Sequence, residues 1–275
     1  MKTGFPETSS LFRVGFVASA LCAFVFGGTI ATAAAADSAT AKSRPYILMV
    51  FNNPVAGKEA EYNDWYNHIH AGEVASQLGF DDALRFVSSP VPMGGETPRR
   101  YVVIYRGKSH DLAQTYAGYF VKSKNAPHGP EMIDHTTNYN DSFAAVGPEI
   151  PGRGANNAGK ARAKTYVWYV YANAAAGKEA AFEKWFDGDF ASAISKVPGF
   201  ISAQPYLRTA EQLGNATRVP APAHLILFKV ATGDIARTMK DAAREKAKLK
   251  SGTADSGSWV SYGFSELGQP IPADK

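Results

Sequence analysis

Cysteine is almost absent from this chain of 275 residues, in which Cys22 is the only one. A single cysteine excludes an intrachain disulfide and any metal site built from several thiolates. No C-x-x-C-H sequence is present, so covalent attachment of a c-type haem is excluded as well. Cys22 lies in an N-terminal segment that we expect to be removed, which leaves the mature chain without a thiol nucleophile.

The chain also lacks an excess of one charge sign. It has 29 Lys and Arg against 25 Asp and Glu, a formal net charge of +4. The basic residues are scattered rather than gathered on one stripe, so nucleic acid is not expected as a partner. The composition, 45% hydrophobic and 20% charged, is typical of a soluble globular protein.

The first 36 residues resemble a targeting segment. Lys2 and Arg13 precede an apolar run, VGFVASALCAFVFGGTIA, which ends in ATAAAA before Asp37. This order predicts a signal peptide cleaved after Ala36, and a periplasmic or secreted protein with no stable membrane association after cleavage. A retained membrane anchor is the alternative, since the apolar run is nearly long enough to span a bilayer.

The rest of the chain repeats itself. YILMVFNNPVAGKEAEYNDWY at 46–66 matches YVWYVYANAAAGKEAAFEKWF at 166–186 without a gap, at an offset of about 120 residues. Further on, YVVIYRGKSHDLA (101–113) matches HLILFKVATGDIA (224–236). We therefore expect two copies of one unit, at 37–147 and 165–275, joined by a Gly- and Pro-rich linker at 148–164.

Each copy reads as the same order of elements. In the first copy, apolar runs bounded by turn residues predict strands, and apolar spacings of three and four predict helices. The expected elements are strand 46–53, helix 57–80, strands 82–91 and 99–107, helix 110–124 and strand 137–147. The order β-α-β-β-α-β is that of the ferredoxin-like unit, whose helices cover one face of the sheet. Two such sheets can cover each other's bare faces.

One motif makes a resemblance specific. Pro54, Gly57, Tyr62, Trp65-Tyr66 and His70 follow the pattern P-x-x-G-x-x-x-x-[FY]-x-x-W-[YF]-x-x-x-H, and a Gly-Phe pair ends the helix. The pattern resembles the dimeric α/β-barrel superfamily, in particular its EthD-type branch. The resemblance implies an α+β fold of tandem ferredoxin-like βαββαβ repeats that pack sheet-on-sheet as an intrachain dimeric α/β barrel. Its members include cofactor-free monooxygenases, cyclases, isomerases and haem proteins, so function depends on the site.

The helix 57–80 carries the candidate catalytic residues. At 100° per residue, Tyr62, Tyr66, His70 and Glu73 lie on one side and His68 lies on the other. The two histidines lack the i, i+4 spacing of a metal site, so no metal is expected. We predict His70 as a general base near neutral pH, with a tyrosine stabilising the substrate anion and Glu73 orienting the imidazole. The alternative is a half-buried structural histidine.

The second copy favours the functional interpretation. Its residues at the positions of His68, His70, Glu73, Tyr62 and Tyr66 are, in that order, Gly188, Phe190, Ala193, Phe182 and Phe186. Packing alone does not explain why only the first copy has polar groups there. We therefore predict one functional pocket in the first copy, with the second copy as its structural partner.

Seven further residues are candidates for substrate binding, and they are His68, Asn52, Trp65, Arg85, His128, His135 and Tyr139. Arg85 has a proline as its counterpart and either binds an anionic group or extends to solvent. The segment 125–141, which holds the last three, is either a pocket rim or a solvent loop.

Three functions remain open. The first is an exported, cofactor-independent acid–base enzyme, of lyase, cyclase or isomerase type, that acts on an apolar aromatic or phenolic molecule. An oxygen-using monooxygenase without a cofactor is a close variant. The second is a haem protein with His70 or His135 as axial ligand, and the third is a small-ligand binding protein without catalysis. Because the fused copies already pair, a monomer is as plausible as a homodimer.

Overall fold

The computed structural model describes residues 43–123, 131–154, 163–214, 221–249 and 251–275. The chain divides into two units, Met1–Ala39 and Thr40–Lys275. The first unit, with the expected signal peptide and Cys22, lies outside the described residues, and so does His128. Within the described part, no helix is long and apolar enough to cross a membrane.

The first half of the described chain has the expected order of elements. They are β1 (Arg44–Asn52), α1 (Glu59–Trp65), the π-helical segment η1 (Tyr66–His70), α2 (Ala71–Leu78), β2 (Asp82–Ser88), β3 (Tyr101–Ser109), α3 (Leu112–Ser123) and β4 (Tyr139–Ala145). Gly79 ends α2 in a left-handed conformation with φ of 68°, where glycine has no steric cost. This confirms the predicted end of the helix.

The second half repeats that order. Its elements are β6 (Lys164–Ala172), α4 (Glu179–Glu183), the π-helical segment η3 (Lys184–Phe190), α5 (Ala191–Ser195), β7 (Phe200–Arg208), β8 (His224–Thr232), α6 (Ile235–Lys246), the 3₁₀ turn η4 (Ser256–Ser258) and β9 (Val260–Glu266). A short strand follows each half, β5 (Ile150–Pro151) and β10 (Ile271–Pro272), and pairs with β7 and β2 respectively. The expected linker therefore begins with a strand.

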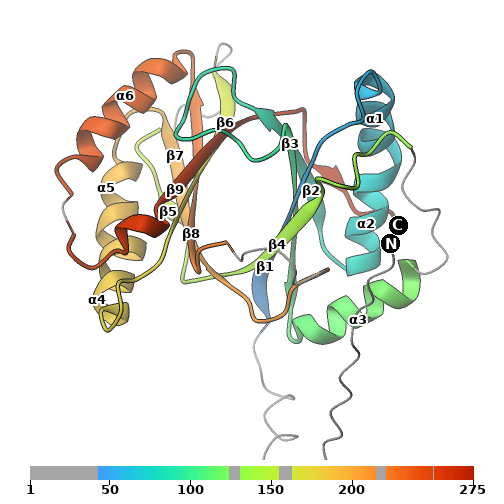
Figure 1. Ribbon diagram of the computed structural model, residues 1–275, viewed down its shortest axis with the longest axis horizontal. Coiled ribbons are helices and arrows are strands. Elements are labelled where there is room, and N and C mark those ends of the chain that lie inside the picture. The colour runs from blue at the N-terminus through green and yellow to red at the C-terminus, as the bar shows by residue number, and fades with distance from the viewer. Residues whose placement is uncertain (1–42, 124–130, 155–162, 215–220, 250) are drawn as a thin grey trace, which may run out of the picture. The chain divides into compact units, whose positions relative to one another are not determined.

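The strands form one antiparallel sheet that closes on itself. Their order is β2-β3-β1-β4 in the first half and β7-β8-β6-β9 in the second. β4 pairs with β7, and β9 pairs with β2. The two four-stranded sheets are therefore joined at both edges, and the result is a closed barrel with the α+β composition that the sequence predicted (Figure 1).

Alternation along the strands separates three cores. On β1, Ile47, Met49 and Phe51 face the barrel interior, where they meet Tyr169 and Tyr171 of β6. The residues between them face the helices of the first half. A third cluster fills the equivalent space between α4, α5, α6 and the second half of the sheet. The central strands β1, β3, β6 and β8 are thus buried on both faces over most of their length, which explains their nearly continuous apolar sequences.

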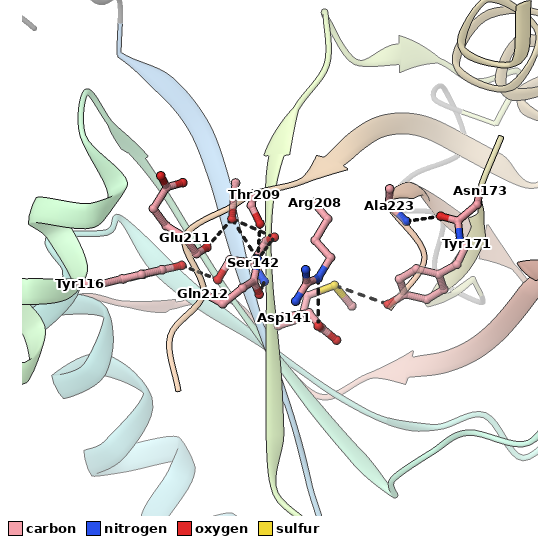
Figure 2. A network of polar contacts seen from close by, with 11 residues as sticks. Tyr116, Asp141, Ser142, Tyr171, Asn173, Arg208, Thr209, Glu211, Gln212 and Ala223 are labelled. Carbon is pink, nitrogen blue, oxygen red and sulfur yellow. Dashed lines mark hydrogen bonds and ion pairs between the residues drawn. The ribbon is translucent and has the colours of Figure 1, made fainter. Parts of the chain in front are cut away.

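One of the two seams is held by side chains as well as by strand pairing. Figure 2 shows Gln212 against the backbone of Ser142, to which its side chain both donates and accepts hydrogen bonds of 3.1 and 2.8 Å. Beside it, Arg208 Nε lies 3.6 Å from the buried carboxylate of Asp141. Tyr116 of α3 reaches the Ser142 hydroxyl at 2.5 Å. The first and second halves are therefore fastened together at β4 and β7.

Because side chains of both halves pack together in the barrel interior, we predict a single unfolding transition. Phe143 is fully buried and its ring lies 6.1 Å from that of Tyr171, across the interior from the other half. Phe143→Ala is expected to lower the free energy of unfolding by about 3–5 kcal/mol, with both halves unfolding together in urea. The exposed Val121→Ala is the control and should change it little. Two separate transitions in the wild type would contradict this interdependence.

Candidate functional site

The helix that carries the candidate residues is interrupted at the site itself. η1 covers Tyr66–His70 and has wider turns than the α-helices on either side. Such segments are rare and frequently mark functional sites. The second half has η3 at the same place. Since the helix is irregular here, an arithmetic of 100° per residue holds only approximately beyond Tyr66.

The most unusual group in the site is a buried cation. The side chain of Arg85 on β2 is only 1% exposed. Its Nη1 donates to Asn67 Oδ1 at 2.5 Å, and its Nη2 donates to Asn63 Oδ1 at 2.9 Å. Within the described residues, no carboxylate forms an ion pair with Arg85, and its Nε has no hydrogen-bond partner. A buried charge held only by neutral groups is costly and uncommon.

Tyrosine rings surround this guanidinium. Its central carbon lies 4.8 Å from the ring centroid of Tyr66, 5.3 Å from that of Tyr62 and 5.7 Å from that of Tyr101. The faces of aromatic rings attract cations. The rings therefore offset part of the cost of burying Arg85, but they do not neutralise its charge.

Asn52 links the two candidate tyrosines. Its side chain, fully buried at the end of β1, accepts a hydrogen bond from the Tyr62 hydroxyl at 2.5 Å and donates one to the Tyr66 hydroxyl at 2.7 Å. Because Tyr66 is the acceptor, its own proton remains available to a further partner. Burial raises the pKa of both tyrosines, which therefore stay protonated at neutral pH.

His70 is half-buried between aromatic rings. Its imidazole stacks on Trp65 at 4.1 Å and meets the ring of Tyr66 edge-on at 5.0 Å. Burial, and next the positive charge of Arg85, lower the pKa of His70 to about 4. The prediction of a base that titrates near neutral pH is thus corrected, since the imidazole of the free protein is neutral across that range.

Glu73 has a different neighbour from the one we expected. Its carboxylate accepts a hydrogen bond from Gln77 at 3.0 Å, and its charge acts on Tyr119 of α3. In the described part of the chain no hydrogen bond joins Glu73 to His70. The imidazole is instead oriented by its contacts with Trp65 and Tyr66.

The remaining candidates lie away from this group. His68 is exposed, and its Nδ1 lies 3.0 Å from both the backbone oxygen and the carboxylate of Asp64. His135 is exposed in a turn. Tyr139 stacks on Phe51 at 4.7 Å and so packs against the barrel interior, on the face of the sheet opposite to Arg85.

Three neighbours of Arg85, namely Asn63, Asn67 and Tyr101, were not among the predicted site residues. Asn63 donates to the Tyr101 hydroxyl at 3.1 Å as well as accepting from Arg85. The Tyr101 hydroxyl in turn donates to Glu59, which is paired with Arg100 at 2.7 Å. The comparison of the two copies contained the signal, because Tyr101 corresponds to His224 and Asn63 to Glu183.

Those same positions show that the second half is not free of ionisable groups. Asp187 stands where the first half has Asn67, and its Oδ2 lies 3.9 Å from Nδ1 of the buried His224. Pro205 replaces Arg85. Burial raises the pKa of Asp187 to about 7 and lowers that of His224. The second half thus has a half-buried acid where the first half has a buried cation. Asp187 was not among the residues compared between the two halves of the sequence.

Known proteins resemble the chain only distantly. No protein-family model matches it, and no curated protein matches it. Among solved structures, an anthrone oxidase-like protein is 12% identical over 85% of this chain and 95% of that one, with a TM-score of 0.48. A candidate monooxygenase from Fusobacterium nucleatum is 9% identical over 84% of this chain and 95% of that one, with a TM-score of 0.44. A mutant chlorite dismutase from Candidatus Nitrospira defluvii is 9% identical over 82% of this chain and 93% of that one, with a TM-score of 0.43.

The strand pairing of this chain itself establishes the fold. The fold is a closed antiparallel α/β barrel. Similarity of this degree says nothing about a reaction, so function has to come from the residues of the site.

The two shifted pKa values have opposite effects on stability. Between pH 6.5 and 4 the unfolded chain protonates His70 and the folded chain does not, so the free energy of unfolding falls as the pH falls. Between pH 4 and 7 folded Asp187 keeps a proton that the unfolded chain releases, so that free energy falls as the pH rises.

Urea unfolding at pH 4.5 and pH 7.5 measures both effects. Relative to wild type, His70→Gln is expected to gain stability at pH 4.5, and Asp187→Asn is expected to gain it at pH 7.5, each on the order of 1–3 kcal/mol. The wild type serves as the common reference, so the other titrating groups cancel. Equal changes at both pH values would show that these groups titrate normally in the folded protein.

Proposed function

We propose that the protein is a cofactor-independent enzyme that removes a proton from an apolar phenolic or enolisable aromatic molecule. The observation that carries this proposal is the uncompensated Arg85 beside the neutral His70. A buried guanidinium without a carboxylate favours an anion, and a neutral imidazole can accept the proton whose loss creates that anion. An aromatic substrate suits a site whose surroundings are tyrosine and tryptophan rings.

The two groups are coupled in a way that favours the reaction. Arg85 and His70 contact the same ring, that of Tyr66, at 4.8 and 5.0 Å. The charge of Arg85 is one cause of the low pKa of His70. A substrate anion beside Arg85 offsets that charge and so raises the pKa of His70. The imidazole therefore becomes a stronger base as the substrate proton leaves.

The hydrogen-bond chain through Asn52 supplies a proton donor for the oxygen of the substrate anion. Asn52 holds the Tyr66 hydroxyl as an acceptor, so the phenolic proton is free to be donated to the oxygen of an enolate or phenolate. Arg85 and Tyr66 would then share the negative charge. Such preorganised donors lower the barrier because they need no reorientation during the reaction.

The fate of the anion separates two reaction classes. Without oxygen, the proton returns at another atom, or a bond forms or breaks within the substrate, as in an isomerase, cyclase or lyase. With oxygen, a substrate methylene becomes a carbonyl, one oxygen atom enters the product and the other leaves as water. Both start from the same deprotonation, and oxygen consumption during turnover distinguishes them.

Haem fits the described residues poorly. His70, the first suggested axial ligand, is enclosed by two aromatic rings, since Trp65 stacks on it at 4.1 Å and Tyr66 meets it edge-on at 5.0 Å. The other suggested ligand, His135, is exposed. No step of the proposed reaction uses haem.

The proposal includes the finer points of the sequence interpretation. We take the chain to be two fused ferredoxin-like repeats at 37–147 and 165–275, of the EthD-type branch, with the reaction in the first repeat. The strand order within each half supports this. We also take the chain to be exported, with cleavage after Ala36, which N-terminal sequencing of the mature protein would test.

Replacement of His70 tests the base. His70→Gln is expected to lower kcat by about 10²-fold or more, measured over a panel of phenols, enolisable ketones and lactones. Arg85→Gln should remove activity for the same substrates, because the anion loses its counter-charge. The exposed His68→Gln is the matched control and should keep full activity. Unchanged turnover in His70→Gln, with the fold intact by circular dichroism, would reject the assignment.

A spectrum tests the cofactor. The purified protein, with and without added hemin, is expected to show no Soret band beyond that of free hemin. Recovery of every panel substrate unchanged would instead favour a protein that only binds small ligands. A Soret band that His70→Gln abolishes would replace the proposal with haem chemistry.

A further inference from the structure

The barrel contains a partly open pocket that the proposed reaction does not use. Its volume is about 180 Å³, and strands of both halves supply most of its wall. The apolar part of the wall consists of Ile47, Leu84, Phe86, Ile104, Val167 and Leu227. A protein cavity on the order of 150 Å³ holds one benzene molecule. This barrel pocket is therefore large enough for one six-membered ring.

The barrel pocket and the candidate active site lie on opposite faces of the same sheet. On β2, Leu84 and Phe86 line the pocket, while Arg85 between them contacts the ring of Tyr66. Neighbouring strand residues point to opposite faces. A molecule in the barrel pocket is thus separated from Arg85 and His70 by the sheet itself.

Equivalent positions of the two halves meet at this pocket. Arg106 of β3 and Lys229 of β8 both line it, and they correspond to each other in the matched segments 101–113 and 224–236. Ile104 and Leu227 correspond in the same way. Each half therefore supplies one cation to the wall of the same pocket.

The two halves differ in polarity at two other positions of the wall. Gln204 stands where the first half has Leu84, and Tyr206 stands where it has Phe86. The register of β7 on β8 matches that of β2 on β3 at these positions, which confirms the correspondence. Packing alone would be satisfied by apolar side chains in both halves. We therefore expect a polar group of a bound molecule on the side of β7.

Three hydrogen-bond donors of the wall have no acceptor among the described residues. Arg106 binds Asp82 through Nε and Nη2, at 2.7 and 2.5 Å, which leaves its Nη1 unused. The Nζ of Lys229 lies 3.9 Å from Glu149, beyond hydrogen-bond distance. The third donor is the Tyr206 hydroxyl, which stays protonated because burial, and next the charge of Glu149, raise its pKa. The side chains of Arg106 and Lys229 are 36% and 37% exposed, so a ligand can reach them.

The charges of the wall favour an anion as the acceptor. Two cations line the pocket against one carboxylate, that of Glu149. That carboxylate accepts a hydrogen bond from Ser202 at 2.6 Å. A ligand carboxylate carries one negative charge and accepts several hydrogen bonds, and such bonds to ionised groups are the stronger ones.

We propose that the barrel pocket is a second small-molecule site, which takes a monocarboxylate with a single ring. The ring lies against the apolar wall, and the carboxylate accepts hydrogen bonds from Tyr206, Arg106 and Lys229. The site depends on closure of the barrel, because each half supplies part of the wall.

Calorimetric titration of the full mature chain at pH 7.5 with benzoate and with its uncharged analogue benzamide tests the site. Benzoate is expected to bind about tenfold more tightly than benzamide. Tyr206→Phe should weaken benzoate about tenfold, since a hydrogen bond to a charged group is lost. Lys229→Gln should weaken it about threefold, and Glu149→Gln should strengthen it by a similar factor. Lys240→Gln, which changes an exposed lysine of α6, is the matched control and should leave benzoate affinity unchanged.

Two outcomes of this titration would overturn the proposal. One is equal affinity for benzoate and benzamide, which would remove the role of the charge. The other is wild-type affinity for benzoate in both Tyr206→Phe and Lys229→Gln. Absence of saturable benzoate binding in the wild type would overturn it as well.

Two further variants assign the location. Val167→Phe fills the apolar part of the pocket and should abolish binding of both compounds; Leu227→Phe serves the same purpose if that variant does not fold. Arg85→Gln should bind benzoate as the wild type does, and Tyr66→Phe takes its place if it does not fold. Loss of benzoate binding in that variant would place benzoate in the candidate active site and overturn the proposal. None of these measurements depends on turnover, so the proposed function is tested separately.

Discussion

The structure depends on one constraint, which is that each four-stranded sheet has helices on only one face. The other face is apolar in both halves, with Ile47, Met49 and Phe51 on β1 and Val167, Tyr169 and Tyr171 on β6. Exposed to water, such a face would destabilise the chain, and unpaired sheet edges would invite aggregation. Pairing of β4 with β7 and of β9 with β2 removes both problems at once. Fusion of the two halves makes this pairing independent of protein concentration.

The closed barrel makes it possible to bury a charge at the site. Arg85 is held by Asn63 and Asn67 from the helix and by tyrosine rings from helix and sheet, and Asn52 in turn binds the hydroxyls of Tyr62 and Tyr66. A flexible site would let the guanidinium reach water, where it would attract an anion less strongly. The rigidity of the barrel therefore maintains the electrostatic imbalance on which the proposed chemistry depends.

The sequence predicted the order of elements well because local patterns determine them. Alternating and continuous apolar runs marked the strands, and Gly79 marked the end of α2. The sequence also predicted that Tyr62, Tyr66 and His70 lie on one face of the helix, since helical spacing is kept approximately through one irregular turn. It did not predict the π-helical segment, because no local pattern distinguishes such a segment from an α-helix.

Contacts over long sequence distances account for the other differences. The burial of Arg85 depends on Asn67 and Asn63, which lie 18 and 22 positions away in the helix, and on Tyr101 of β3. The partner of Glu73 is its own helix neighbour Gln77 rather than His70. A helical wheel gives only the angle of each side chain around the helix axis. It therefore does not decide whether Glu73 contacts Gln77 or His70.

The two halves show how the same backbone accommodates opposite charges. In the second half Pro205 removes the arginine, and Asp187 with His224 replaces an amide and a tyrosine. These differences are consistent with each other, because an acid at the position of Asn67 facing Arg85 would neutralise the cation on which the proposed reaction depends. Conversely, Asp187 without a nearby arginine holds its proton up to about pH 7. The first half thus holds a cation without a carboxylate at this place and the second half an acid, while both halves have the same strand order.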